Sequence, residues 1–175
     1  LWISCAGGLS GISHIPAQRV EGEGEKVQVK VCGLMGGHSG AEIDKNRANA
    51  NKLMGRFLYG LKKKAEYALI SLTGGQKDNA ITRECTAEFL TDSVAEVKAY
   101  AKELQEQLRE EYTGSDENIT FEITEKGTAT AEVLHPTSQE KIVFYLQNVP
   151  FGIQKMSGTI KGLVETSSNI GILRL

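Results

Sequence analysis

Hydrophobic residues recur with two different periods along the chain, and each period predicts a different kind of element. From Glu25 to Val31 they alternate, with Val27, Val29 and Val31 on one side, as in a half-buried β-strand. Between residues 50 and 61 the spacing becomes three and four, the apolar stripe of an amphipathic helix, formed by Ala50, Leu53, Met54, Phe57, Leu58 and Leu61. The pattern therefore predicts a strand followed by a helix.

The same two periods continue further along the chain. An apolar run at 67–72 and an alternating segment at 82–89 predict two antiparallel strands joined by a polar loop. Ser93 and Glu96 have the spacing of a capping box ahead of a second long helix, and residues 119–124 alternate again. The order strand, helix, strand, strand, helix, strand predicts an α+β fold. We expect a ferredoxin-like two-layer sandwich, an antiparallel sheet with helices on one face.

The remaining residues are predicted to extend this sandwich. Pro136 starts a third helix, and a glycine-punctuated stretch at 157–175 adds strands. We expect residues 1–175 to form a single domain, with a core at about 25–126 and an extension at about 127–175. The chain begins at Leu1 with neither an initiator methionine nor a signal-peptide pattern, so we expect it to belong to a longer protein.

Composition and charge narrow the class of protein. A hydrophobic content of 40% and a charged content of 24% are ordinary for a globular domain, and no run is apolar enough to predict membrane insertion. A formal net charge of −2 predicts no surface for nucleic acid. The three cysteines, Cys5, Cys32 and Cys85, form no C-x-x-C pair and favour a reducing, cytoplasmic compartment.

The stretch with the clearest chemical character is Gly36-Gly37-His38-Ser39-Gly40, between the first strand and the first helix. Flanking glycines let the backbone turn tightly and approach a ligand, which leaves the imidazole of His38 projecting from the loop. A presented imidazole can donate a hydrogen bond. The alternative is a loop histidine that bonds only locally, and the glycines on both sides favour the functional interpretation.

Other candidate residues give weaker signals. Asn79 lies in a polar loop between two predicted strands, where asparagine usually makes a turn. His14 and His135 receive no role. The chain contains no H-x-D or H-E-x-x-H spacing, so no metal site is predicted within it. Cys32 and Cys85 fall in predicted strands and are expected to be buried instead of nucleophilic.

Four ordered segments together resemble one family. They are Trp2–Gly8, Gly33–Gly40 running into Asn49–Leu53, Gly75–Arg83, and Val164–Gly171. In order and spacing they are similar to the aminoacyl-histidine (Xaa-His) dipeptidases, and the resemblance covers nearly the whole chain. The chain departs from the family at Thr82, where proline is usual, and at Asn46 and Ala48, where glycines are common.

This resemblance implies a two-zinc metallo-dipeptidase of the cytoplasm. In the family a catalytic domain holds two zinc ions, while an inserted lid domain with a ferredoxin-like core mediates homodimerisation and closes over the dipeptide substrate. By position, His38 resembles the lid histidine that reaches into the partner subunit's active site and stabilises the oxyanion. Asn79 resembles the lid asparagine that helps to hold the substrate. The family's zinc ligands and a substrate-binding arginine would lie outside residues 1–175, so this chain alone is expected to bind no cofactor and to be inactive.

A function of another class remains open on the residues alone. The same sandwich hosts many unrelated functions, so a stand-alone small-molecule-binding or regulatory module is the alternative. Flanking coding sequence that carries H-x-D and further metal ligands would decide for the dipeptidase. An RNA-binding module of similar topology would need an aromatic strand motif and a basic face, and this sequence has neither.

Overall fold

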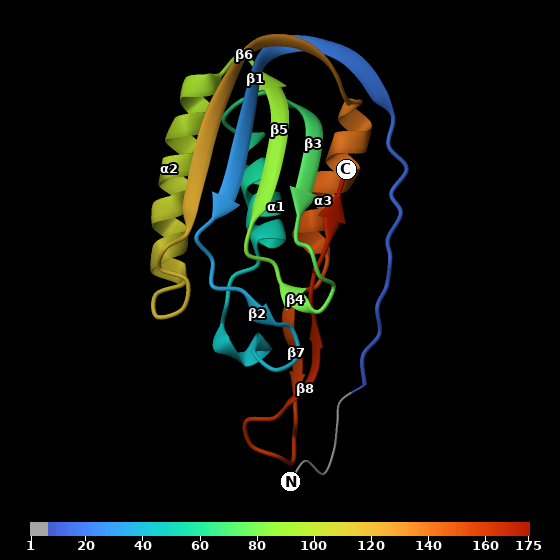
Figure 1. The fold of residues 1–175 in the computed structure, drawn as a ribbon, viewed down its shortest axis with the longest axis vertical. Coiled ribbons are helices and arrows are strands. Elements are labelled where there is room, and N and C mark those ends of the chain that lie inside the picture. The colour runs from blue at the N-terminus through green and yellow to red at the C-terminus, as the bar shows by residue number, and fades with distance from the viewer. Residues whose placement is uncertain (1–6) are drawn as a thin grey trace.

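An antiparallel sheet with helices on one face forms the main body of the computed structural model, which describes residues 7–175 (Figure 1). Within those residues the helices are α1 (Ala50–Leu61), α2 (Val94–Glu111) and α3 (Pro136–Asn148), with a short 3-10 turn at Ile43–Lys45. The strands are β1 (Arg19–Cys32), β2 (Gly37–His38), β3 (Ala68–Gly74), β4 (Ala80–Ile81), β5 (Cys85–Thr91), β6 (Thr120–Leu134), β7 (Gly152–Met156), β8 (Val164–Ser168) and β9 (Leu173–Arg174). The segment Trp2–Ala6 of the first family-like motif, with Cys5, lies outside the described residues.

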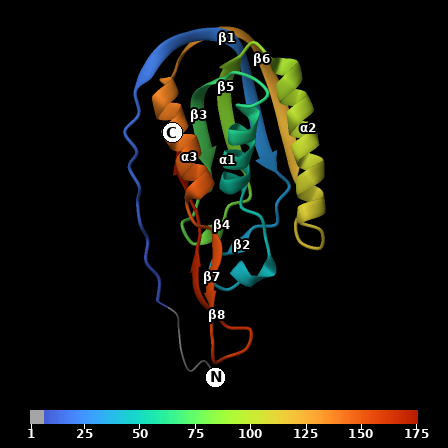
Figure 2. The ribbon, with the colours of Figure 1, turned by 180° about the vertical axis from the view of Figure 1, so that it is seen from behind.

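The sheet has the strand order β6-β1-β5-β3-β9, and every neighbouring pair in it is antiparallel. The first four of these strands, together with α1 and α2, follow the chain order strand, helix, strand, strand, helix, strand. Seen from behind, all three helices lie on the same side of the sheet (Figure 2). The predicted α+β, ferredoxin-like sandwich is therefore confirmed, and β9 extends it by one short strand.

The hydrophobic core lies between the sheet and the helices, where the two sequence periods placed it. Val27, Val29 and Val31 of β1 are fully buried. Phe57 of α1 is also fully buried, and its ring lies 5.6 Å from that of Tyr100 and 5.3 Å from that of Phe121 between centroids. Burying aromatic and branched side chains in this way contributes roughly 1.5–3 kcal/mol each. The core fixes the sheet and α1, from which the loops at one end of the sandwich emerge.

Two elements differ from the sequence prediction. The strand predicted at 119–124 continues to Leu134, because residues 128–134 pair with residues 19–25 of β1 in a ribbon that curves away from the sheet (Figure 1). Alanine alternates with threonine through residues 128–131, and large apolar residues appear only at the end, where Val133 and Leu134 are buried, so the apolar pattern is weak. The capping box at α2 was wrong, since the Ser93 side chain makes no cap hydrogen bond and its backbone N–H donates to Thr91 Oγ1 at 3.1 Å.

The third helix is confirmed, and side chains hold both of its ends. The His135 side chain caps its start by accepting from the Thr137 N–H at 3.3 Å. At its other end Lys52 Nζ of α1 donates to the carbonyls of Leu146, Gln147 and Val149 at 2.7–2.9 Å. Burial lowers the pKa of the Lys52 ammonium. A cation is favoured there because the last carbonyls of a helix lack internal partners.

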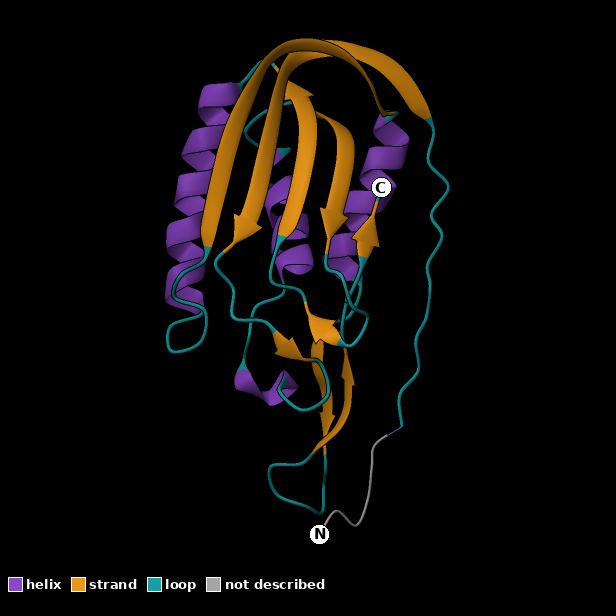
Figure 3. Ribbon diagram, viewed as in Figure 1, coloured by secondary structure: helices purple, strands orange, loops and turns teal. Residues whose placement is uncertain are grey.

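Beyond α3 the chain forms a hairpin of β7 and β8 that projects from one end of the sandwich (Figure 3). The short strands β2 and β4 lie at the same end. Cys32 and Cys85 are both buried in strands, as the sequence predicted, and burial raises the pKa of the Cys85 thiol to about 12. Across residues 7–175, no helix is both long and apolar enough to cross a membrane.

Candidate functional site

The two loops that carry His38 and Asn79 are joined by a small two-stranded sheet. β2 pairs antiparallel with β4, so that His38 lies opposite Ala80 and Gly37 opposite Ile81. The N–H of Ser39 then donates to the carbonyl of Asn79 at 3.0 Å. Two residues separated by 41 positions along the chain are thereby placed on adjacent backbones, and the side chains of both are exposed.

The hydrogen bonds of the His38 ring define which nitrogen carries its proton. Nδ1 accepts from the N–H of Gly40 at 3.0 Å and from the N–H of Ala41 at 3.1 Å. A neutral imidazole that accepts at Nδ1 bears its proton at Nε2. A side chain on Gly40 would put its Cβ 3.3 Å from His38 Cε1, so the glycine lets the turn close against the ring. His38 therefore presents an N–H donor at its outer edge.

The backbone of His38 is held by an ion pair in the following turn. Glu42 Oε2 accepts from the His38 N–H at 2.8 Å, and the Glu42 N–H donates to the His38 carbonyl at 3.0 Å. Arg47 pairs with Glu42 at 2.8 Å and also donates to the Gly36 carbonyl. The His38 N–H, and after it the charge of Arg47, lower the pKa of the Glu42 carboxyl. At Gly37 a Cβ would lie 2.1 Å from Arg47 Nη1, so this arrangement requires glycine there.

Asp116 holds the two ends of the same loop together. Its Oδ1 accepts from the N–H of Met35 at 2.6 Å, and its Oδ2 accepts from the N–H of Ala48 at 2.7 Å. The side chain is buried, with 1% of its surface exposed. A buried carboxyl group that accepts two backbone N–H groups is favourable, whereas each of those donors left unpaired would be costly. Asp116 comes from the turn after α2, far from the loop in sequence.

Where the chain departs from the family, the structure supplies a local reason. Thr82, which stands in place of proline, is 2% exposed, and its hydroxyl lies 2.9 Å from the Ile170 carbonyl and 3.2 Å from Asn51 Nδ2. Hydrogen bonds thus hold the loop at a position where a proline ring would restrict it. Asn46, in place of glycine, has a φ of 52°, a left-handed conformation that asparagine tolerates better than most residues.

Several residues of this site were not identified from the sequence. Asp116, Asn49, Asn51 and Asn169 are all bonded to backbone groups of the two loops or of the segments behind them. Asn49, Asn51 and Asn169 lie in the family-like segments, but asparagine is also a frequent turn residue, so residue type alone assigned them no role. Only their burial and their partners distinguish them.

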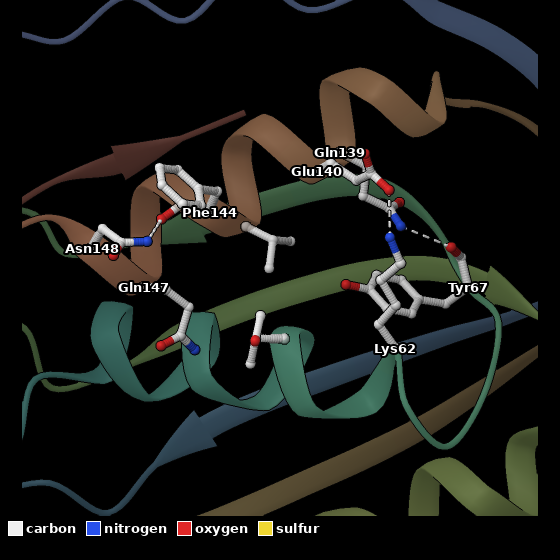
Figure 4. A pocket seen from close by; sticks show the side chains of 9 residues that line it. Lys62, Tyr67, Gln139, Glu140, Phe144, Gln147 and Asn148 are labelled. Carbon is white, nitrogen blue, oxygen red and sulfur yellow. Dashed lines mark hydrogen bonds and ion pairs between the residues drawn. The ribbon is translucent and has the colours of Figure 1, made fainter.

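The described residues show no cluster of metal ligands at these loops, and the groove between α1 and α3 lies apart from them. No three His, Cys, Asp or Glu side chains of residues 7–175 lie together as a metal site would require, so the two zinc ions implied by the resemblance do not fit here. A groove of about 530 Å³ lies between α1 and α3 (Figure 4). Lys62 and Glu140 pair across its rim at 2.5 Å, and Gln139 donates to the Tyr67 carbonyl. These polar groups bind one another, and none of the lining residues belongs to the His38 or Asn79 loop.

Comparisons with known proteins identify the family to which this chain belongs. Residues 29–116, half of the chain, match the family model described as a peptidase dimerisation domain. The cytosol non-specific dipeptidase of Escherichia coli (strain K12) is 32% identical over 179 aligned positions, which cover 100% of this chain and 37% of that protein. The crystal structure of aminoacylhistidine dipeptidase from Vibrio alginolyticus superposes with a TM-score of 0.80 and 32% identity, covering 91% of this chain and 32% of that one.

The chain is thus a dimerisation domain of the kind found in peptidases. It belongs to the M20 peptidase dimerisation domain family, and the two relatives described above carry the names of dipeptidases. It spans about a third of the length of each.

Proposed function

We propose that residues 1–175 form the single lid and dimerisation domain of a cytoplasmic zinc dipeptidase, in which His38 stabilises the oxyanion formed during peptide hydrolysis. The observation that carries this proposal is the bonding of the His38 ring. Two backbone N–H groups occupy Nδ1, so the exposed Nε2 is a donor held on a loop that several bonds make rigid. A hydrogen-bond donor whose position is fixed in advance stabilises an oxyanion as its charge develops.

The chemistry follows from where charge develops. When a nucleophile attacks the scissile carbonyl, its oxygen gains negative charge, and a donor aimed at that oxygen stabilises the transition state more than the substrate. The nucleophile would be water activated by the zinc ions of the catalytic domain. His38 contributes by donating from Nε2, and because its orientation is already set, little reorganisation is needed during the reaction.

Asn79 supplies the second part of the proposal. Its side chain is exposed on the loop beside His38, and an amide both donates and accepts hydrogen bonds, which suits it to hold the polar backbone of a dipeptide. An Xaa-His substrate is supported by the name of the Vibrio relative, and a cytoplasmic location by the name of the Escherichia coli relative. The lid would act in a homodimer, as the family description suggests.

A complementation experiment tests whether His38 acts across the dimer. One full-length variant would carry His38→Ala and another a substitution of a zinc ligand, so that each is inactive alone. In a mixed dimer one active site receives an intact zinc site and an intact His38, so unfolding and refolding the mixture should restore up to about a quarter of wild-type activity, because about half of the dimers are mixed and each has one functional site. Formation of mixed dimers would be verified with two affinity tags. Mixed dimers without activity would show that His38 does not serve the partner subunit.

The 175 residues expressed alone should neither hydrolyse dipeptides nor bind zinc with a defined stoichiometry. The reason is that a hydrolytic zinc site needs several converging ligands, which the family resemblance places outside this chain. Isothermal calorimetry with zinc and a chromatographic assay of Xaa-His dipeptides measure both properties. Tight binding of zinc, or metal-dependent turnover by the highly purified chain, would contradict the proposal that the zinc site lies outside these 175 residues.

A further inference from the structure

Asn79 is the middle one of three successive residues, 78–80, whose backbone carbonyls all accept hydrogen bonds. Its own carbonyl accepts from the Ser39 N–H at 3.0 Å, next to His38. The carbonyls on either side, of Asp78 and Ala80, both lie within hydrogen-bond distance of one atom, Asn169 Nδ2, at 3.3 and 2.8 Å. One side-chain amide therefore contacts the carbonyls on both sides of Asn79.

The side-chain amide of Asn169 is itself held by a second asparagine. Its Oδ1 accepts from Asn49 Nδ2 at 3.0 Å, and the same Asn49 Nδ2 donates to the Ile170 carbonyl at 3.0 Å. Asn49 is 1% exposed and caps α1, since its Oδ1 accepts from the N–H groups of Asn51 and Lys52. Because a carbonyl only accepts and a backbone N–H only donates, these partners set the orientation of both amides. The loop of Asn79 is thus tied to the first turn of α1.

Close packing at two glycines shows that the segment holding Asn169 lies directly against this loop. A Cβ on Gly171 would lie 2.5 Å from the Asp78 carbonyl oxygen, and a Cβ on Gly75 would lie 1.8 Å from the Gly171 carbonyl oxygen. Gly75 also has a φ of 71°, which favours glycine. Residues 169–171 and the Asn79 loop therefore have little room to move relative to each other.

We propose that Asn169 is a positioning residue that holds Asn79 beside His38. Its two contacts hold the carbonyls of the residues before and after Asn79, and its bond to Asn49 connects them to helix α1 and so to the hydrophobic core. Asn169 touches neither substrate nor reacting atoms in this proposal, and it acts only through Asn79. The consequence for catalysis rests on the proposed function, whereas the consequence for the loop does not.

Asn169→Asp in the full-length protein separates positioning from general packing. The aspartate keeps an oxygen that accepts from Asn49, but it loses the N–H donors and places a second oxygen against the Asp78 and Ala80 carbonyls. Amide hydrogen exchange of the peptides covering 36–41 and 78–81 should become faster than in wild type. Asn148→Asp is the matched control, because Asn148 Nδ2 also donates to a backbone carbonyl, that of Phe144 at 2.8 Å, but on α3. It should leave exchange in both loops unchanged.

Kinetics provide the second measurement. Displacing a substrate-holding group by about 1 Å can cost up to about 100-fold, so Asn169→Asp should lower kcat/KM by roughly 10- to 100-fold. The changes in kcat and in KM should stand in the same proportion in Asn169→Asp as in Asn79→Ala. The double variant Asn169→Asp/Asn79→Ala should have a kcat/KM no lower than that of Asn79→Ala alone.

The outcomes are distinguishable. Unchanged exchange in both loops, or a fully additive double variant, would overturn the positioning role. Faster exchange with normal kinetics in both Asn169→Asp and Asn79→Ala would support that role, while removing Asn79 from the proposed substrate site.

Discussion

Replacing His38 with alanine is expected to lower kcat of the full-length protein by on the order of 10²- to 10³-fold if it acts as proposed, the usual effect of losing one oxyanion donor. The two bonds to Nδ1 leave the ring proton at Nε2, and alanine removes this donor. Substrate affinity should change much less, since the negative charge develops only in the transition state. Steady-state kinetics with a saturating Xaa-His dipeptide measure the two parameters separately.

The protein should remain folded in this variant. The His38 side chain is exposed, and exposed side chains away from caps and cores usually change stability by no more than about 0.5 kcal/mol. The thermal midpoint should therefore stay close to that of wild type. His14→Ala, which removes another exposed histidine, is the control and should retain full kcat. A near-normal kcat for His38→Ala would favour the interpretation of His38 as a loop histidine that bonds only locally.

Replacing Asp116 with alanine is expected to lower the free energy of unfolding by about 1–4 kcal/mol, because it leaves one buried donor without a partner at about 1–3 kcal/mol and one part-buried donor at about 1 kcal/mol or less. Those donors are the N–H groups of Met35 and Ala48, at the two ends of the His38 loop. The variant should also lose activity beyond its loss of stability, since the loop is no longer closed at its base. Urea unfolding, followed by circular dichroism, gives the change in free energy.

An exposed aspartate in the same loop provides the control for this experiment. Asp44 lies within the 3-10 turn, is exposed, and pairs with its neighbour Lys45 at 3.6 Å. Asp44→Ala should change stability by no more than about 0.5 kcal/mol. If Asp116→Ala were equally mild, the two backbone contacts of Asp116 would not be what holds the loop, and a bound water in the space left by the side chain would be the simplest replacement.

The main elements of the sandwich could be predicted from the sequence because the spacing of their hydrophobic residues reflects which side chains are buried. Val27, Val29 and Val31 alternate because one face of β1 covers the core, and Phe57 belongs to the helical stripe of α1 for the same reason. The ribbon at residues 128–134 has a weaker pattern, since large apolar side chains reach the core only at its end, where Val133 and Leu134 are buried. Its length was therefore missed, although its chain position was adjacent to a strand that was predicted.

For the proposed site, the local sequence nominated His38 because glycines flank it on both sides. It could not show that a small sheet joins the His38 and Asn79 loops, that Asp116 closes the loop, or that Asn169 contacts the carbonyls on both sides of Asn79. These contacts join residues far apart in the chain, and they use polar side chains whose sequence pattern is the same in an ordinary turn. Only the packing of α1 against the sheet brings the partners within hydrogen-bond distance, and so the tertiary structure decided how the site is held.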